Sequence, residues 1–207
     1  MKKFLALALI LVLALSLTAC SKNMRSYDIG NADRARVFFE KYNSMVEKYG
    51  EGKSVDGTLY GTAVVRLYDF TGDGYPEMLL AYSSEKDKQV DSVMVCGFDM
   101  GYAEIYNEKI TSKESKDAKS ETLWAYTDAG KLSYLVIGED LSAERSYQTF
   151  IKADIEGKAS YAFAEAFSTD GKDLNGTYER FDIMGADFKA IDAENQNVLN
   201  ALETQKN

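Results

Sequence analysis

Apolar residues recur at helical spacing in two stretches of the chain. The first stripe consists of Phe38, Tyr42, Met45, Val46 and Tyr49. Asn31 or Asp33 can cap the helix that this stripe predicts, and Gly50 ends it. The second stripe follows Asp187 and is interrupted by Asn195. It consists of Phe188, Ile191, Val198, Leu199 and Leu202. We expect each stripe to pack against a sheet.

Between the two predicted helices, the chain has the pattern of short strands separated by turns. The expected strands cover residues 60–70, 75–82, 91–99, 102–106, 122–126, 132–138, 146–154, 160–167 and 177–182. Short turns favour antiparallel neighbours. Residues 64–68 and 91–99 are largely apolar on both faces, which is typical of the interior of a sheet. The pattern predicts an α+β fold: a mainly antiparallel β-sheet or meander of about seven to nine strands, flanked by an N-terminal and a C-terminal helix.

The chain begins with the features of an export signal. Lys2 and Lys3 are followed by an almost unbroken apolar run from Phe4 to Leu17, and small residues precede Cys20. A basic head, an apolar middle and a small-residue cleavage site are typical of a signal peptide. The apolar run is shorter than the roughly 20 residues that a membrane-spanning helix needs.

With its cysteine at the cleavage site, the segment Leu17-Thr18-Ala19-Cys20 resembles the lipobox of bacterial lipoproteins. The resemblance implies a thioether-linked diacylglycerol on Cys20 and an extracytoplasmic, membrane-anchored protein. The chain then divides into a signal peptide at 1–19, a tether at 20–30 and a single globular domain at 31–207. The alternative is an ordinary secretory signal in which the cysteine has no role.

Composition and charge narrow the possible partners. The formal net charge is −9, and removal of Lys2 and Lys3 with the signal changes it to −11. Such a chain repels both nucleic acid and anionic lipid headgroups, so nucleic acid is not an expected partner. The expected membrane attachment therefore depends on the lipid at Cys20. The chain has no histidine and two cysteines. If Cys20 carries lipid, Cys96 has no disulfide partner, and its apolar surroundings predict a buried, inert thiol.

One acidic segment, residues 69–77, lies between two predicted strands. Counted from Asp69, oxygen-bearing side chains stand at positions 1, 3, 5 and 9, namely Asp69, Thr71, Asp73 and Glu77. Gly74 is at position 6, where a tight loop commonly needs positive φ. Oxygen ligands at this spacing suit Ca²⁺. A true EF-hand also needs a glutamate at position 12, where this chain has Leu80.

In its strand–loop–strand setting, this segment resembles the calcium loops of FG-GAP or integrin-like repeats and the single loop of small lipoproteins from Gram-positive gut bacteria. The resemblance implies Ca²⁺ ligation by the side chains of Asp69, Thr71, Asp73 and Glu77 and by the backbone carbonyl of Tyr75. Thr71 and Glu77 depart from the usual pattern, and the motif occurs once, whereas a propeller needs several repeats. The alternative is an acidic β-turn without metal.

Common catalytic motifs are missing from the sequence. It has no Gly-x-Ser-x-Gly motif, phosphate loop or dinucleotide fingerprint, and without histidine it cannot build a Ser–His or Cys–His pair. We therefore expect a lipid-anchored binding or accessory protein without catalysis, with structural Ca²⁺ at 69–77. One alternative is a carboxylate-based hydrolase of glycan or cell-wall material. The other is a metal-free surface module. No motif selects a particular protein or glycan partner.

Overall fold

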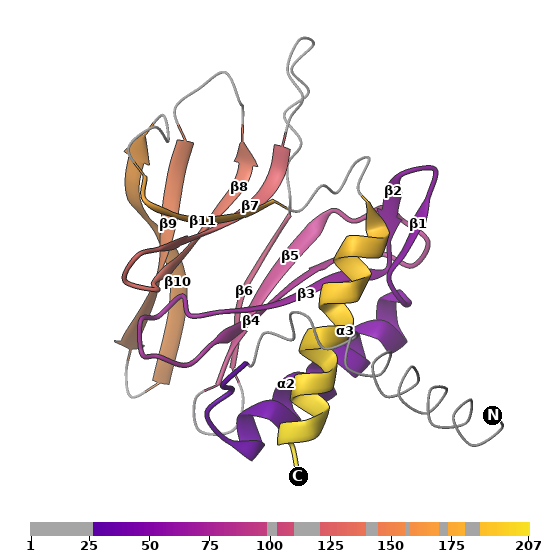
Figure 1. Ribbon diagram of the computed structural model, residues 1–207, viewed down its shortest axis with the longest axis horizontal. Helices are drawn as coiled ribbons and strands as arrows, with labels where there is room; N and C mark the ends of the chain where they lie inside the picture. The colour runs from indigo at the N-terminus through magenta and orange to yellow at the C-terminus, as the bar shows by residue number, and fades with distance from the viewer. Residues whose placement is uncertain are drawn as a thin grey trace, which may run out of the picture.

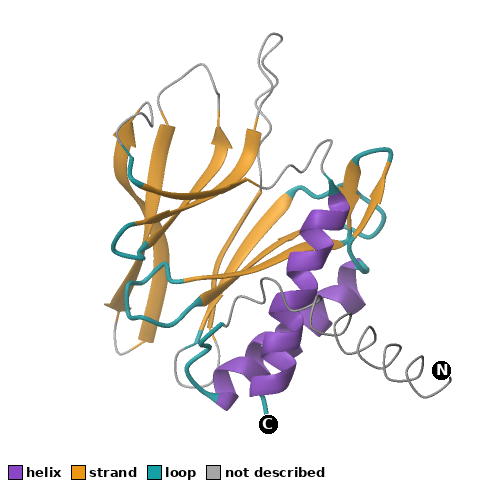
Figure 2. Cartoon of the chain, viewed as in Figure 1, coloured by secondary structure: helices purple, strands orange, loops and turns teal. Residues whose placement is uncertain are grey.

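A computed structural model describes residues 27–98, 103–109, 121–139, 145–155, 158–169, 174–180 and 187–207 (Figure 1). The expected signal peptide and Cys20 lie outside these residues. The described chain contains two helices and three antiparallel sheets (Figure 2). The predicted α+β class is therefore confirmed, whereas the predicted single sheet is wrong, since its strands are divided between separate sheets.

Both helices begin at the predicted residues. In α2 (Ala32–Tyr49), Oδ1 of Asn31 accepts a hydrogen bond from the Arg34 N–H at 2.8 Å, so Asn31 rather than Asp33 is the cap. Gly50 ends α2 with φ of 93°. In α3 (Phe188–Gln205), Asp187 caps the first turn. Side-chain caps satisfy N–H groups that a helix cannot pair internally.

The central sheet has four strands in the order β3–β4–β5–β6. Its strands are β3 (Thr62–Tyr68), β4 (Glu77–Tyr82), β5 (Ser92–Gly97) and β6 (Ala103–Lys109). Side chains of β4 and β5 alternate between two hydrophobic clusters, one on each face of the sheet. Leu80 and Met94 face the helices, and Leu79 and Val93 face the second sheet. The predicted burial of both faces is confirmed.

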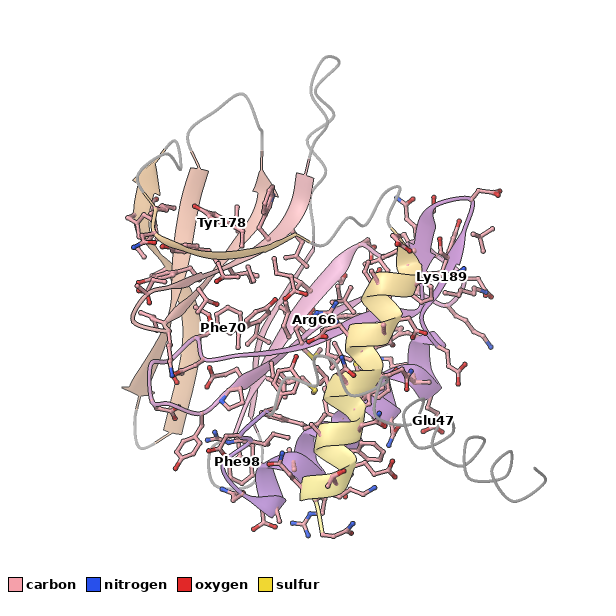
Figure 3. All side chains as sticks on the ribbon, in the orientation of Figure 1. Glu47, Arg66, Phe70, Phe98, Tyr178 and Lys189 are labelled. Carbon is pink, nitrogen blue, oxygen red and sulfur yellow. The ribbon has the colours of Figure 1, made fainter. Side chains whose placement is uncertain are left out.

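The second sheet has five strands in the order β10–β9–β8–β7–β11. They are β7 (Glu121–Asp128), β8 (Ser133–Glu139), β9 (Arg145–Ile155), β10 (Lys158–Thr169) and β11 (Gly176–Arg180). The fold thus has three layers: two helices, the four-stranded sheet and the five-stranded sheet (Figure 1). Phe70 is fully buried in the cluster between the sheets (Figure 3).

A small hairpin of β1 (Lys53–Val55) and β2 (Thr58–Tyr60) precedes the central sheet. It also corrects the expected strand at 60–70, which the chain divides at Gly61. Gly61 has φ of 70°, and a Cβ atom there would lie 2.1 Å from the carbonyl oxygen of Glu51. Only glycine tolerates both the positive φ and this close approach, so the strand stops and restarts.

Residues 27–30, the end of the predicted tether, pack against α3. Ile29 is fully buried, and its N–H donates to Oε1 of Gln205 at 3.3 Å. Nε2 of Gln205 donates to the carbonyl oxygen of Tyr27 at 2.7 Å. The Tyr27 hydroxyl donates to Glu194. The folded region therefore includes residues before Asn31.

Candidate functional site

The acidic loop, residues 69–77, connects β3 to β4 and closes through its own backbone. Oδ1 of Asp69 accepts from the Gly72 N–H at 2.6 Å, and Oδ2 accepts from the Gly74 N–H at 2.9 Å. Oδ1 of Asp73 accepts from the Tyr75 N–H at 2.8 Å. These bonds satisfy donors that the tight turn would otherwise leave without partners.

Glu77 is the buried member of the loop, with 4% of its surface exposed. Its Oε2 accepts from the backbone N–H groups of Phe70 at 2.8 Å and Thr71 at 3.2 Å. The Thr71 hydroxyl donates to Oε1 at 3.2 Å. Burial raises the pKa of Glu77 to about 7, the hydrogen bond from Phe70 opposes this rise, and the charges of Asp73 and Asp69 add to it.

The predicted calcium ligands are brought into one loop, but the carboxylates among them accept their hydrogen bonds from the loop itself. Among the residues that the structure describes, no group of three or more His, Cys, Asp or Glu side chains is placed to hold a metal ion. The carboxylates of Asp69, Asp73 and Glu77 instead accept N–H groups, and the Tyr75 side chain lies under the Arg34 guanidinium, 4.8 Å from the ring centre. In the described loop, these carboxylates act as acceptors for backbone N–H groups, as they do in an acidic turn. Ca²⁺ binding stays a prediction that requires the three carboxylates to converge.

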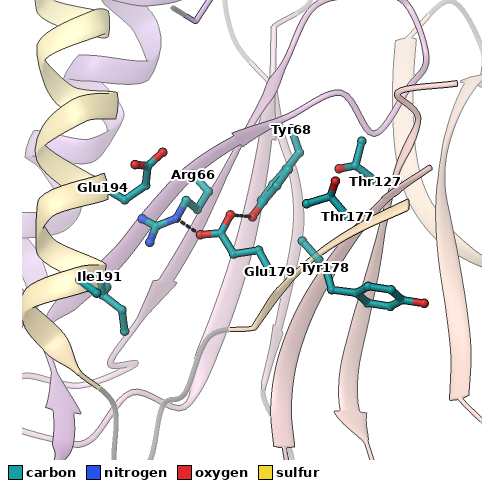
Figure 4. Close-up of a pocket in the computed structure, with 10 residues that line it drawn as sticks. Arg66, Tyr68, Thr127, Thr177, Tyr178, Glu179, Ile191 and Glu194 are labelled. Atoms are coloured by element: carbon teal, nitrogen blue, oxygen red, sulfur yellow. Dashed lines mark hydrogen bonds and ion pairs between the residues drawn. The ribbon is translucent and has the colours of Figure 1, made fainter. Parts of the chain in front are cut away.

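A second feature, which we call the junction pocket, lies where β3, β7, β11 and the first turns of α3 meet (Figure 4). It is a cavity of about 360 Å³. Its lining includes Arg66, Tyr68, Thr127, Thr177, Glu179 and Ile191. This volume is at the small end of the range for ligand pockets, roughly 300–1,000 Å³.

A chain of charged and polar contacts forms one wall of the junction pocket. Nε of Arg66 pairs with Oε1 of Glu179 at 2.6 Å, and the Tyr68 hydroxyl donates to Oε2 of Glu179 at 2.5 Å. Nη1 of Arg66 also donates to Oδ1 of Asn195 at 2.7 Å. Burial, followed by the negative charge of Glu179, raises the pKa of Tyr68 well above its ordinary value. The wall is therefore held by charge-assisted hydrogen bonds.

Two strand edges bring these side chains together. β3 is an edge of the central sheet, and β11 is an edge of the second sheet. On β11, Thr177 and Glu179 point into the pocket, whereas the ring of Tyr178 points away and packs 5.0 Å from Tyr126, measured between ring centres (Figure 4). This is the ordinary alternation of side chains along a strand.

The pattern of the sequence does not predict the junction pocket. The available signal was Arg66, a charged residue inside an otherwise apolar strand. A buried charge is normally paired, so Arg66 requires a partner. The partner Glu179 lies 113 residues away in the sequence, and nothing in the pattern selects it among the other glutamates.

Glu194 on α3 is a second carboxylate at the junction pocket. Its Oε1 accepts from the Tyr27 hydroxyl, and its Oε2 accepts from Nδ2 of Asn197 at 3.0 Å. A carboxylate-based hydrolase pairs an ionised carboxylate with one of raised pKa. Glu77, whose pKa is raised to about 7, is not among the residues that line this pocket.

Cys96 has 2% of its surface exposed, in agreement with the predicted buried thiol. Within the described residues, no helix has both the length and the apolar character needed to cross a bilayer. Comparison with protein families, with curated proteins and with solved structures finds no match to this chain.

Proposed function

We propose that this chain is a lipid-anchored binding protein on the extracytoplasmic side of the membrane, without catalytic activity. It would be attached through Cys20 and would present the junction pocket to a small ligand. The observation that carries the binding role is the pocket itself, which is built from three layers of the fold and holds paired polar groups at its wall. Preformed cavities with a few convergent polar groups are the usual form of ligand sites.

The hydrogen bonds of the two carboxylates at the junction pocket, Glu179 and Glu194, favour ligand binding over hydrolysis. Both oxygens of Glu179 and both oxygens of Glu194 already accept a hydrogen bond from a neighbouring side chain. A general acid must carry a transferable proton, and a nucleophile must reach its target. Carboxylates held in this way are suited to orienting a ligand instead.

The anchor is supported by the basic head, apolar run and cysteine at 1–20. Ca²⁺ in the acidic loop is a further part of the proposal. It is supported by the oxygen spacing of Asp69, Asp73 and Glu77 and by the lack of any lysine or arginine ion-paired with these three in the described chain. A divalent cation would neutralise the negative charge gathered there.

Metabolic labelling with an alkyne palmitate tests the anchor. In a bacterial host with the lipoprotein pathway, the wild-type chain should incorporate label and sediment with membranes. Cys20→Ser should lose the label and leave the membrane fraction, because the thioether has no attachment atom. Cys96→Ala is the matched control and should keep the label. Labelling of Cys20→Ser at the wild-type level would refute the anchored protein.

A further inference from the structure

We propose that the junction pocket binds one uncharged sugar unit, either a free monosaccharide or the terminal unit of a glycan. This inference rests on the proposed function, since it assigns a ligand class to the same pocket. It depends on three properties of the pocket: its charge balance, its pattern of hydrogen-bonding groups and its size.

Three charged side chains line the pocket, Arg66, Glu179 and Glu194, and because each is already held by neighbouring groups, an uncharged ligand disturbs them least. Arg66 and Glu179 neutralise each other at 2.6 Å, and Tyr68 holds the second oxygen of Glu179. The Arg66 side chain is almost fully buried, with 4% of its surface exposed. A charged ligand would have to compete with this pair, and a charge left without a partner in a buried site is costly. An uncharged ligand leaves the pair intact.

The hydrogen-bonding groups favour a ligand rich in hydroxyls. The Thr177 hydroxyl lines the pocket and makes no hydrogen bond within the described chain. Thr127 also lines the pocket and shares a hydrogen bond with Ser133 at 2.9 Å. Each hydroxyl can donate and accept, and each carboxylate oxygen of Glu179 has a second lone pair. Sugar hydroxyls also donate and accept, so they match this wall.

Apolar surface and size complete the match. Ile191 and Ala190 of α3 and Ala125 of β7 supply the apolar part of the lining, and the Tyr68 ring stands at the wall (Figure 4). A sugar ring carries C–H groups between its hydroxyls and can pack on such a surface. A cavity of about 360 Å³ is small, so we infer a single ring rather than a chain of them.

Saturation-transfer NMR and calorimetry on the full, detergent-solubilised chain test this inference. The probes are glucose, galactose, mannose and N-acetylglucosamine, each as the free sugar and as its methyl glycoside. At least one should bind. Binding of the methyl glycoside identifies a glycan end as the source, and binding of the free sugar alone identifies a monosaccharide. Glucosamine and glucuronate are the charged comparisons and should bind more weakly.

Two variants connect binding to the junction pocket. Ala190→Tyr places a ring in the cavity and should abolish binding. Ala193→Tyr makes the same change at an exposed position of α3 that does not line the pocket, and it should bind like wild type. Thr177→Val removes one hydroxyl and should weaken binding about tenfold, the effect of one lost hydrogen bond. Thr58→Val, on the small hairpin, is its control.

Three results would overturn the ligand class: no uncharged sugar binds, a charged sugar binds more tightly than all of them, or Ala190→Tyr binds like wild type. These results leave palmitate labelling of Cys20 untouched, so a wrong ligand class remains distinguishable from a wrong anchor. Loss of labelling with sugar binding intact would refute the anchor alone.

Discussion

Glu77 shows how a single buried carboxyl group makes stability depend on pH. Its pKa is about 7 in the folded chain, against an ordinary value of 4.5. The fold therefore prefers the protonated form. This contribution is fully present below pH 4.5 and is lost as the pH rises to about 7, where the group ionises in a buried site.

Glu77→Gln should remove this pH dependence. Glutamine can still accept from the backbone of the loop, and it cannot ionise. In chelator, the variant should gain roughly 3 kcal/mol relative to wild type between pH 4.5 and pH 8, the equivalent of the pKa shift. Urea unfolding at several pH values measures this gain. Glu47→Gln, on an exposed position of α2, should follow the wild-type curve. Parallel curves for Glu77→Gln and wild type would refute the assignment.

The same loop is the place to test Ca²⁺. At a Ca²⁺ concentration about ten times Kd, binding to the folded state should stabilise it by ~1.4 kcal/mol and raise Tm. Asp73→Ala should lower Tm in Ca²⁺ and remove its Ca²⁺ dependence, because it deletes one of three carboxylates. Glu47→Ala removes an equal charge elsewhere and should keep the dependence. Identical wild-type melting curves in chelator and in millimolar Ca²⁺ would favour the metal-free turn.

For this loop, the sequence predicted the position and the polar residues but not their contacts. Oxygens at alternate positions between two strands predict a tight acidic loop, and the structure has one. Acidic residues can have the same spacing along the sequence whether their carboxylates accept backbone N–H groups or bind a cation. Spacing alone therefore cannot distinguish the two, and the hydrogen bonds to Asp69 and Glu77 became visible only in three dimensions.

Among the elements, α3 has a role beyond covering the sheet. Asn195 has 4% of its surface exposed and bonds to the free edge of β3. Its Oδ1 accepts from the Val65 N–H at 2.9 Å, and its Nδ2 donates to the Ala63 carbonyl at 2.8 Å. An amide side chain thus satisfies the backbone groups that a neighbouring strand would satisfy. An unpaired edge would otherwise be a site for aggregation.

Asn195→Ala should cost about 3–5 kcal/mol of unfolding free energy. The change leaves the Val65 N–H and the Ala63 carbonyl without partners and removes one contact of Arg66, and buried groups without partners cost about 1–3 kcal/mol each. Urea unfolding measures the loss. Asn200→Ala makes the same replacement at an exposed position of α3 and should change stability by less than about 1 kcal/mol. Equal effects of the two variants would contradict the role of Asn195.

Pattern and turn chemistry predicted most elements, and the exceptions have identifiable causes. In the sequence, Asn195 is only an interruption of an apolar stripe. The structure explains this polar residue by its hydrogen bonds to the edge of β3. The strand β1 was missed because Lys53–Val55 is short and lacks apolar alternation. The break at Gly61 was missed because its cause, the nearby carbonyl of Glu51, belongs to a segment outside that strand.

At the scale of the whole molecule, the division of most strands between a four-stranded and a five-stranded sheet could not be predicted from the pattern. A sheet that is apolar on both faces needs a packing layer on each face. In this fold, both helices belong to the same layer, on one face of the central sheet. The five-stranded sheet packs on the other face of the central sheet, and the buried residues between the two sheets include Phe70 and Leu123. The junction pocket forms at the border of these layers, where residues far apart in sequence meet.

The position of α3 in the chain affects when the protein can finish folding. During synthesis α3 emerges after every strand described here, yet Asn195 completes the edge of β3 and Gln205 holds Tyr27 and Ile29. In a nascent chain that still lacks α3, the β3 edge of the central sheet therefore lacks its Asn195 partner. Tyr27 and Ile29 likewise have no α3 to pack against. Under the export that we propose, this delay would keep the chain loosely folded, and so able to cross the membrane unfolded, until α3 has been made.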